Sequence, residues 1–177
     1  MSEYLPASPF LGSSRAVQPL GHFGRAVLRC PPTMVDVVGE RLGIALPQQA
    51  CRAAIEGKLA ALWLGPDEWL LLTDDAGDDW VAELQARLGD ALCALVDVSH
   101  RQVALAVRGP QAETILASGC ALDLSPAAFP EGMCTRTMYD KAEIVLWRVA
   151  ADAFHVEVWR SFARYVEELL RVAEVEA

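Results

Sequence analysis

Two apolar runs separated by a short polar break constrain the fold of this chain most. Residues 58–72 read KLAALWLGPDEWLLL, and the break is Gly65-Pro66-Asp67-Glu68. Proline presets the backbone for the second position of a tight turn, and short apolar runs bounded by turn residues are typical of strands. The segment therefore predicts a β-hairpin. Because both strands are apolar on both faces, we expect them to lie centrally in a sheet.

The segments around this hairpin predict a β-α-β-β-α-β order for the first half of the chain. The expected elements are a strand over 26–30, a helix over 33–43, the hairpin, a helix over 79–88 and a strand over 91–98. Thr33 can cap the first helix and Gly43 can end it, while Asp78 or Asp79 can cap the second. This order is typical of a ferredoxin-like unit.

The second half repeats this pattern weakly. Its expected elements are a strand over 102–108, a helix beginning at Gly109-Pro110, strands over 134–139, 143–149 and 153–159, and a helix over 161–173. The repeat looks imperfect, because this half has an extra hairpin strand before its final helix. The fold class is α+β, with two fused ferredoxin-like units at 23–98 and 99–177 in one globular domain over 23–177. Residues 1–22, rich in Ser, Pro and Gly, predict an extended arm that is either mobile or laid over another surface. The apolar side chains of Tyr4, Leu5, Phe10 and Leu11 favour the second alternative.

Composition argues against several classes of partner. The formal net charge is −9, whereas a nucleic-acid surface needs clustered Lys and Arg and an anionic membrane attracts basic segments. No apolar stretch approaches the roughly 20 residues of a membrane span, and no signal peptide is evident. The five cysteines are an odd number and include no CxxC pair, which favours a reduced cytoplasmic protein with buried thiols.

One short stretch holds the three side-chain types of a hydrolytic triad, namely Asp97, Ser99 and His100. In an extended segment Asp97 and Ser99 share a face and His100 points the other way. A working triad needs the imidazole between the acid and the nucleophile, which this order prevents without a sharp kink. We therefore expect Asp97 and Ser99 to satisfy nearby backbone groups where the chain passes between the two units.

Other polar groups give no convergent chemistry. His155 alternates with apolar neighbours and shares a face with Glu157, a pattern that we interpret as the solvated face of a strand. The acidic segment DDAGDD (74–79) lacks the EF-hand pattern, so turn and capping roles are expected. Phosphate-binding glycine motifs are absent from the sequence. We expect no catalytic, cofactor-binding or metal-binding residue in this chain.

Trp69 directly follows the polar turn of the hairpin. It is either a core residue at the edge of the sheet or an exposed anchor for recognition, since Trp is enriched among residues that dominate protein interfaces. The sequence leaves both alternatives open.

Several blocks taken together resemble a known family. They are LGPDEWLLL (64–72), VDVSHRQVALAVRGPQAETILASGCALDL (96–124), MCTRTMYDKAEIVLWRV (133–149) and FHVEVWRSFARYVEELL (154–170). In this combination and order they are similar to the gamma subunit of heterotetrameric sarcosine oxidase. The resemblance covers most of residues 20–173. It implies the fold of the tetrahydrofolate-binding domain of the glycine-cleavage aminomethyltransferase.

The resemblance also implies a function within a complex. The partners would be the alpha, beta and delta subunits of a cytoplasmic enzyme that oxidises sarcosine to glycine and hydrogen peroxide and passes the one-carbon unit to tetrahydrofolate. FAD, FMN, NAD and tetrahydrofolate would be held by the other subunits, and this chain would be non-catalytic.

Interface residues are the expected functional residues in that case. Arg101, Arg136 and Arg160 lie in the most family-like polar blocks, and the planar guanidinium pairs with carboxylates and stacks on rings. Each could instead bridge strands within its own fold. The alternative function is a free-standing folate-binding protein, either aminomethyltransferase-like or an iron–sulfur-assembly factor. Trp69 would then stack on the folate and Arg101 would pair with its carboxylates.

Overall fold

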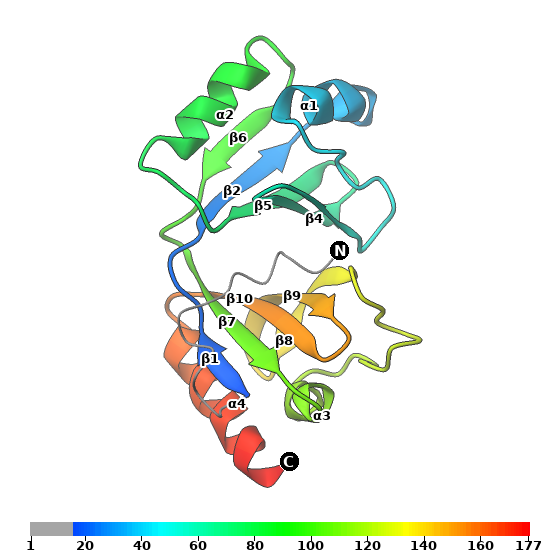
Figure 1. Ribbon diagram of the computed structural model, residues 1–177, viewed down its shortest axis with the longest axis vertical. Helices are drawn as coiled ribbons and strands as arrows, with labels where there is room; N and C mark the ends of the chain where they lie inside the picture. The colour runs from blue at the N-terminus through cyan, green and yellow to red at the C-terminus, as the bar shows by residue number, and fades with distance from the viewer. Residues whose placement is uncertain (1–15) are drawn as a thin grey trace. The chain divides into compact units, whose positions relative to one another are not determined.

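The computed structural model describes residues 16–177, which divide into two compact units (Figure 1). The first unit is His22–Ser99. The second unit is His100–Ala177 together with the described residues that precede His22. Each unit is a five-stranded antiparallel sheet with two main helices, so the predicted α+β class is confirmed.

The first unit has the strand order β3-β4-β5-β2-β6. Its elements are β2 (Gly24–Arg29), α1 (Val35–Leu42), β3 (Ala53–Glu56), β4 (Leu59–Gly65), β5 (Glu68–Thr73), α2 (Trp80–Leu88) and β6 (Ala94–Asp97). Figure 1 shows α1 and α2 on one face of this sheet. Their apolar side chains, including Val38 and Leu84, pack with Leu28, Trp69 and Leu71 of the sheet in one buried cluster.

The hairpin predicted from 58–72 is confirmed as β4 and β5. Gly65 pairs with Glu68 across the turn, and the two strands occupy the second and third positions of the sheet. Every residue of β5 is buried, as expected for a central strand whose middle residues, Trp69 to Leu72, are all apolar. Strand β3 was not predicted, because its sequence AAIE is short, half exposed and rich in alanine, which has a low strand propensity.

The second unit has the strand order β1-β7-β10-β9-β8. Its elements are β1 (Val17–Pro19), β7 (Gln102–Arg108), α3 (Ala112–Ala117), β8 (Cys134–Tyr139), β9 (Ala142–Ala150), β10 (Ala153–Trp159) and α4 (Ala163–Glu176). Ile115 and Leu116 of α3 and Val166 and Leu170 of α4 are fully buried in one cluster with the strands. The predicted strands and helices of this half are all present.

The two units share one topology once β1 and β3 are counted. In each sheet a hairpin (β4–β5 or β9–β10) is flanked on one side by an extra strand (β3 or β8) and on the other by the first strand of the unit (β2 or β7). The remaining edge is β6 in the first unit and β1 in the second. The expectation that only the second half carries an extra strand is therefore wrong.

Strand β1 comes from the segment expected to be an arm. Residues 1–15 of that segment lie outside the described residues, while Val17 pairs with Val107 of β7 and is 1% exposed. In the second sheet this N-terminal segment occupies the edge that β6 fills in the first unit.

The predicted glycine end of the first helix is confirmed, whereas the predicted polar N-caps make no capping hydrogen bond. Gly43 ends α1 with φ 76°, a left-handed conformation that glycine adopts without a steric penalty. Asp79 occupies the N-cap position of α2 but makes no side-chain capping hydrogen bond, and Thr33 lies in a 3₁₀ turn before α1. Within residues 16–177, the helices are too short or too polar to span a lipid bilayer.

We predict that Val17→Asp destabilises the chain while Pro19→Asp does not. An unpaired carboxylate at the buried Val17 should lower the free energy of unfolding by about 3 kcal/mol or more. The same change at the exposed Pro19 should alter it by no more than about 1 kcal/mol. Urea denaturation measures both values, and equal effects would contradict a buried β1.

Candidate functional site

The Asp97-Ser99-His100 stretch forms a structural turn after β6. The backbone N–H of Ser99 donates to Asp97 Oδ1 at 2.8 Å. Ser99 Oγ accepts from the backbone N–H of Arg25 at 3.0 Å and donates to the Arg25 carbonyl at 3.3 Å. The prediction that Asp97 and Ser99 satisfy backbone groups is confirmed. His100 is exposed, and the hydroxyl that a triad would activate is bonded to backbone instead.

Trp69 belongs to the core of the first unit. Its side chain is 0% exposed, and its indole N–H donates to the carbonyl oxygen of Pro47 at 2.8 Å. The interpretation of Trp69 as an interface anchor is therefore wrong, because β5 is a central strand and this face of it is covered by α1 and α2. For the same reason Trp69 is not placed to stack on a bound folate.

Arg101 is partly exposed and contacts an aromatic side chain of the second unit. Its guanidinium carbon is 5.2 Å from the centre of the Trp159 ring, a cation–π geometry. The antiparallel pairing of β7 with β10 produces this contact, because it places Gln102 opposite Trp159. The backbone N–H of Arg160 donates to the Arg101 carbonyl at 2.9 Å, which ties the two segments together beyond the ends of the strands.

A tight turn adds Phe162 to the same region. The backbone N–H of Phe162 donates to the Trp159 carbonyl at 2.8 Å, and α4 begins at the next residue. Trp159 is 42% exposed and Phe162 is 43% exposed, so two large aromatic side chains close together in sequence both reach the surface. We call Arg101, Trp159, Arg160 and Phe162 the aromatic–arginine patch.

Arg136 lies apart from this patch. It belongs to β8, which is three strands away from β7 across the sheet. Its side chain is half exposed, and its Nε lies 3.9 Å from Glu143 Oε1 on the neighbouring strand β9. This contact corresponds to the alternative in which the arginine bridges strands within its own fold. The structure therefore brings Arg101 and Arg160 together and separates Arg136 from them.

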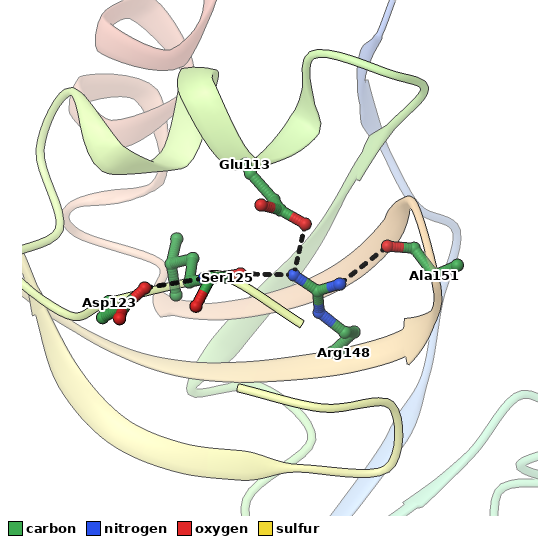
Figure 2. Close-up of polar contacts among 6 residues, drawn as sticks. Glu113, Asp123, Ser125, Arg148 and Ala151 are labelled. Atoms are coloured by element: carbon green, nitrogen blue, oxygen red, sulfur yellow. Dashed lines mark hydrogen bonds and ion pairs between the residues drawn. The ribbon is translucent and has the colours of Figure 1, made fainter. Parts of the chain in front are cut away.

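A buried arginine in the second unit was not predicted from the sequence. Arg148 of β9 is 1% exposed, and Figure 2 shows its guanidinium between α3 and the loop before β8. It donates to Glu113 Oε1 at 2.7 Å, to the Leu124 carbonyl at 2.5 Å and to the Ala151 carbonyl at 2.8 Å. Its guanidinium carbon also lies 4.6 Å from the centre of the Phe154 ring.

These contacts give Arg148 a structural role. The ion pair holds α3, and the carbonyl of Leu124 fixes a loop whose own turn is closed by the N–H of Ser125 donating to Asp123 Oδ1 (Figure 2). That hydrogen bond also lowers the pKa of Asp123. The available sequence signal was an arginine inside the apolar run IVLWRV, because a charge in such a run requires a buried partner.

His155 and Glu157 are not on a solvated face. The two side chains are 5% and 0% exposed, and His155 Nε2 lies 2.7 Å from Glu157 Oε1. The ring of Trp147 lies beside the imidazole, with the two ring centres 5.9 Å apart. The prediction of solvent exposure is wrong because both faces of β10 are buried, which simple alternation along one strand does not reveal.

The five cysteines are free thiols, and Cys30, Cys120 and Cys134 are buried. Burial raises the pKa of Cys30 to about 11, so this thiol remains protonated at neutral pH. In the part of the chain that the structure describes, no group of three His, Cys, Asp or Glu side chains is placed to hold a metal ion.

The fold defines the general class of the protein. The chain matches glycine cleavage system aminomethyltransferase T from Bartonella henselae with a TM-score of 0.68 and 19% identity, over 87% of this chain and 44% of that one. At this identity the match shows a shared fold alone. The chain, with its two α+β units, thus has an aminomethyltransferase-like fold.

The family follows from closer matches. The model of the sarcosine oxidase, gamma subunit family matches residues 29–176, and the chain therefore belongs to that family. A chain of heterotetrameric sarcosine oxidase from Corynebacterium sp. U-96 superposes with a TM-score of 0.83 and 26% identity, over 90% of this chain and 83% of that chain.

Curated relatives agree with this assignment. The sarcosine oxidase subunit gamma of Corynebacterium sp. (strain P-1) is 34% identical over 72% of this chain and 63% of its own length. The subunit of the same name from Arthrobacter sp. is 36% identical over 65% of this chain and 57% of its own length. The alignments therefore span less than two thirds of these relatives.

We predict that Trp69→Ala destabilises the isolated chain by about 3–5 kcal/mol, because it removes a fully buried indole and leaves a cavity. Trp159→Ala, at a half-exposed position, should cost roughly 1 kcal/mol or less. Urea denaturation of both variants measures the difference. If Trp159→Ala proved as destabilising as Trp69→Ala, the assignment of Trp69 to the core and Trp159 to the surface would fail.

We predict that Arg148→Met lowers the free energy of unfolding by about 3–5 kcal/mol, because it leaves Glu113 without its cation and two carbonyl oxygens without donors. Arg171→Met is the matched control, since its ion pair with Glu167 on α4 is partly exposed, and it should cost about 1 kcal/mol or less. Chemical denaturation compares the two. Equal losses would contradict a structural role for the buried network.

Proposed function

We propose that this chain is the gamma subunit of a heterotetrameric sarcosine oxidase and acts by binding the other subunits. The observation that carries the proposal is family membership over residues 29–176, supported by the match to a chain of a heterotetrameric enzyme at a TM-score of 0.83. The complex would oxidise sarcosine to glycine and hydrogen peroxide and transfer the one-carbon unit to tetrahydrofolate.

The proposal assigns the chemistry to the other subunits. The alpha, beta and delta subunits would hold FAD, FMN, NAD and tetrahydrofolate, and the complex would be cytoplasmic. In this chain, polar side chains that could take part in catalysis already have hydrogen-bond or ion-pair partners within the fold. Ser99 bonds to the backbone of Arg25, His155 bonds to Glu157, and Arg148 bonds to Glu113.

The alternative function, a free-standing folate-binding protein, was based on two residues, and one of them is not available to a ligand. It required Trp69 as a stacking surface, but this indole is fully buried and donates its N–H to Pro47. Arg101, its other supporting residue, is stacked on Trp159 of the same unit. The likeness to an aminomethyltransferase supports the fold and adds no folate-binding residue.

Co-expression tests the proposal directly. The tagged chain is produced with candidate alpha, beta and delta subunits, purified through its tag, and the assembly is sized by gel filtration and assayed for sarcosine-dependent peroxide formation. We expect a stable complex of four different chains with that activity. The proposal fails if the other three subunits assemble together while the tagged chain is recovered alone.

A further inference from the structure

The aromatic–arginine patch contains two arginines without an acidic partner in an acidic chain. The sequence has 24 Asp and Glu residues against 15 Lys and Arg residues. Most other arginines of the described chain form an ion pair with one of these acidic residues. The pairs are Arg29–Glu68, Arg41–Asp90, Arg136–Glu143, Arg148–Glu113, Arg164–Glu168 and Arg171–Glu167. Within residues 16–177, the side chains of Arg101 and Arg160 form no ion pair.

Arg101 is held in place without having its charge neutralised. Its guanidinium lies over the Trp159 ring, and its Nε is buried without a hydrogen-bond acceptor among the described residues. A guanidinium stacked on a ring keeps its in-plane N–H groups available for a carboxylate, and a fixed side chain loses less entropy on binding. Arg101 is therefore preorganised to receive an acidic group.

The apolar members of the patch supply the contact area. Trp159 and Phe162 lie at the two ends of the turn closed by the hydrogen bond from Phe162 N–H to the Trp159 carbonyl, and both are more than 40% exposed. Large aromatic side chains and arginine dominate the binding energy of protein interfaces when they lie close together. Arg160, between them in the sequence, is exposed and adds a second unpaired positive charge.

From these contacts we infer that the aromatic–arginine patch is the surface through which this chain binds a larger subunit. The partner segment would combine Asp or Glu carboxylates, which pair with Arg101 and Arg160, with an apolar side chain that covers Trp159 and Phe162. The inference rests on the proposed function and goes beyond it by naming the surface and the chemistry of the partner. Two arginines complement a small number of carboxylates, while the formal net charge of −9 on the whole chain disfavours nucleic acid and an anionic lipid surface.

Charge reversal at Arg160 is the central test, carried out in the co-expressed complex. Tagged variant and untagged wild-type chains compete for the same alpha, beta and delta subunits, and the ratio recovered in the complex measures relative affinity. Arg160→Glu should weaken incorporation at least roughly tenfold, because it places like charges in contact. Arg87→Glu is the matched control, since Arg87 is an exposed arginine of α2, and it should change incorporation less than about twofold.

Two further variants separate the charge from the rings. Arg101→Lys keeps the positive charge but loses the planar stacking and the two-pronged hydrogen bonding, so we expect an intermediate loss. Trp159→Ser should weaken incorporation at least as much as Arg160→Glu. Met138→Ser removes a similarly exposed apolar side chain of the edge strand β8, at 47% exposure, and should assemble normally. Each isolated variant should melt within roughly 4 °C of the wild-type chain, because Trp159, Arg160 and Met138 are exposed and Arg101 is partly exposed.

The outcomes distinguish this inference from the proposed function. Wild-type assembly combined with normal incorporation of Arg160→Glu and Trp159→Ser would overturn the inference and leave the proposed function intact. Failure of the wild-type chain to assemble would overturn both. Reversible self-association of the isolated wild-type chain that is abolished by Trp159→Ser, with assembly unchanged, would assign the patch to a second copy of the chain and would also overturn the inference.

Discussion

The antiparallel pairing of β7 with β10 organises the second unit, and both its core and the aromatic–arginine patch depend on it. The register runs from Ala153 opposite Arg108 to Trp159 opposite Gln102. One face of β10 contributes Phe154, Val156 and Val158 to the core beneath α3 and α4. At one end of the pair, Trp159 meets Arg101 and begins the aromatic–arginine patch. A shift of one residue would exchange the two faces and remove both features.

The same strand β7 also accepts β1 from the beginning of the described chain. Val17 of β1 is buried against the core, and backbone hydrogen bonds from Leu20 to Ala104 and from Arg108 to Ala16 extend the pairing beyond the strand. Each unit thereby has an equivalent set of five strands, although in the second unit one of them precedes the whole first unit in sequence. The backbone N–H and C=O groups of a buried sheet need hydrogen-bond partners. A strand from any part of the chain can supply them.

Much of the fold was predictable from local patterns. The β4–β5 hairpin, the helix end at Gly43 and the strands of the second half follow from apolar runs and turn residues, which act over a few neighbouring positions. The prediction failed where distant parts of the chain decide the environment. Strand β3 has a weak local signal, and the burial of His155, Glu157 and Arg148 depends on what covers each strand. Trp69 and Trp159 have similar local settings at strand ends, yet one is in the core and the other is half exposed.

The sequence by itself determined the secondary structure of both units apart from β1 and β3, the structural use of Asp97 and Ser99, and the family to which the chain belongs, because these depend on short segments and their order. Only the tertiary structure decided that β1 completes the second sheet and that Arg148 is neutralised by Glu113. It also decided that Arg101 and Arg160 share a surface with Trp159 while Arg136 does not. The physical reason is that ion pairs, ring stacking and burial depend on distances in space between residues far apart in the chain, and local patterns carry no information about those distances.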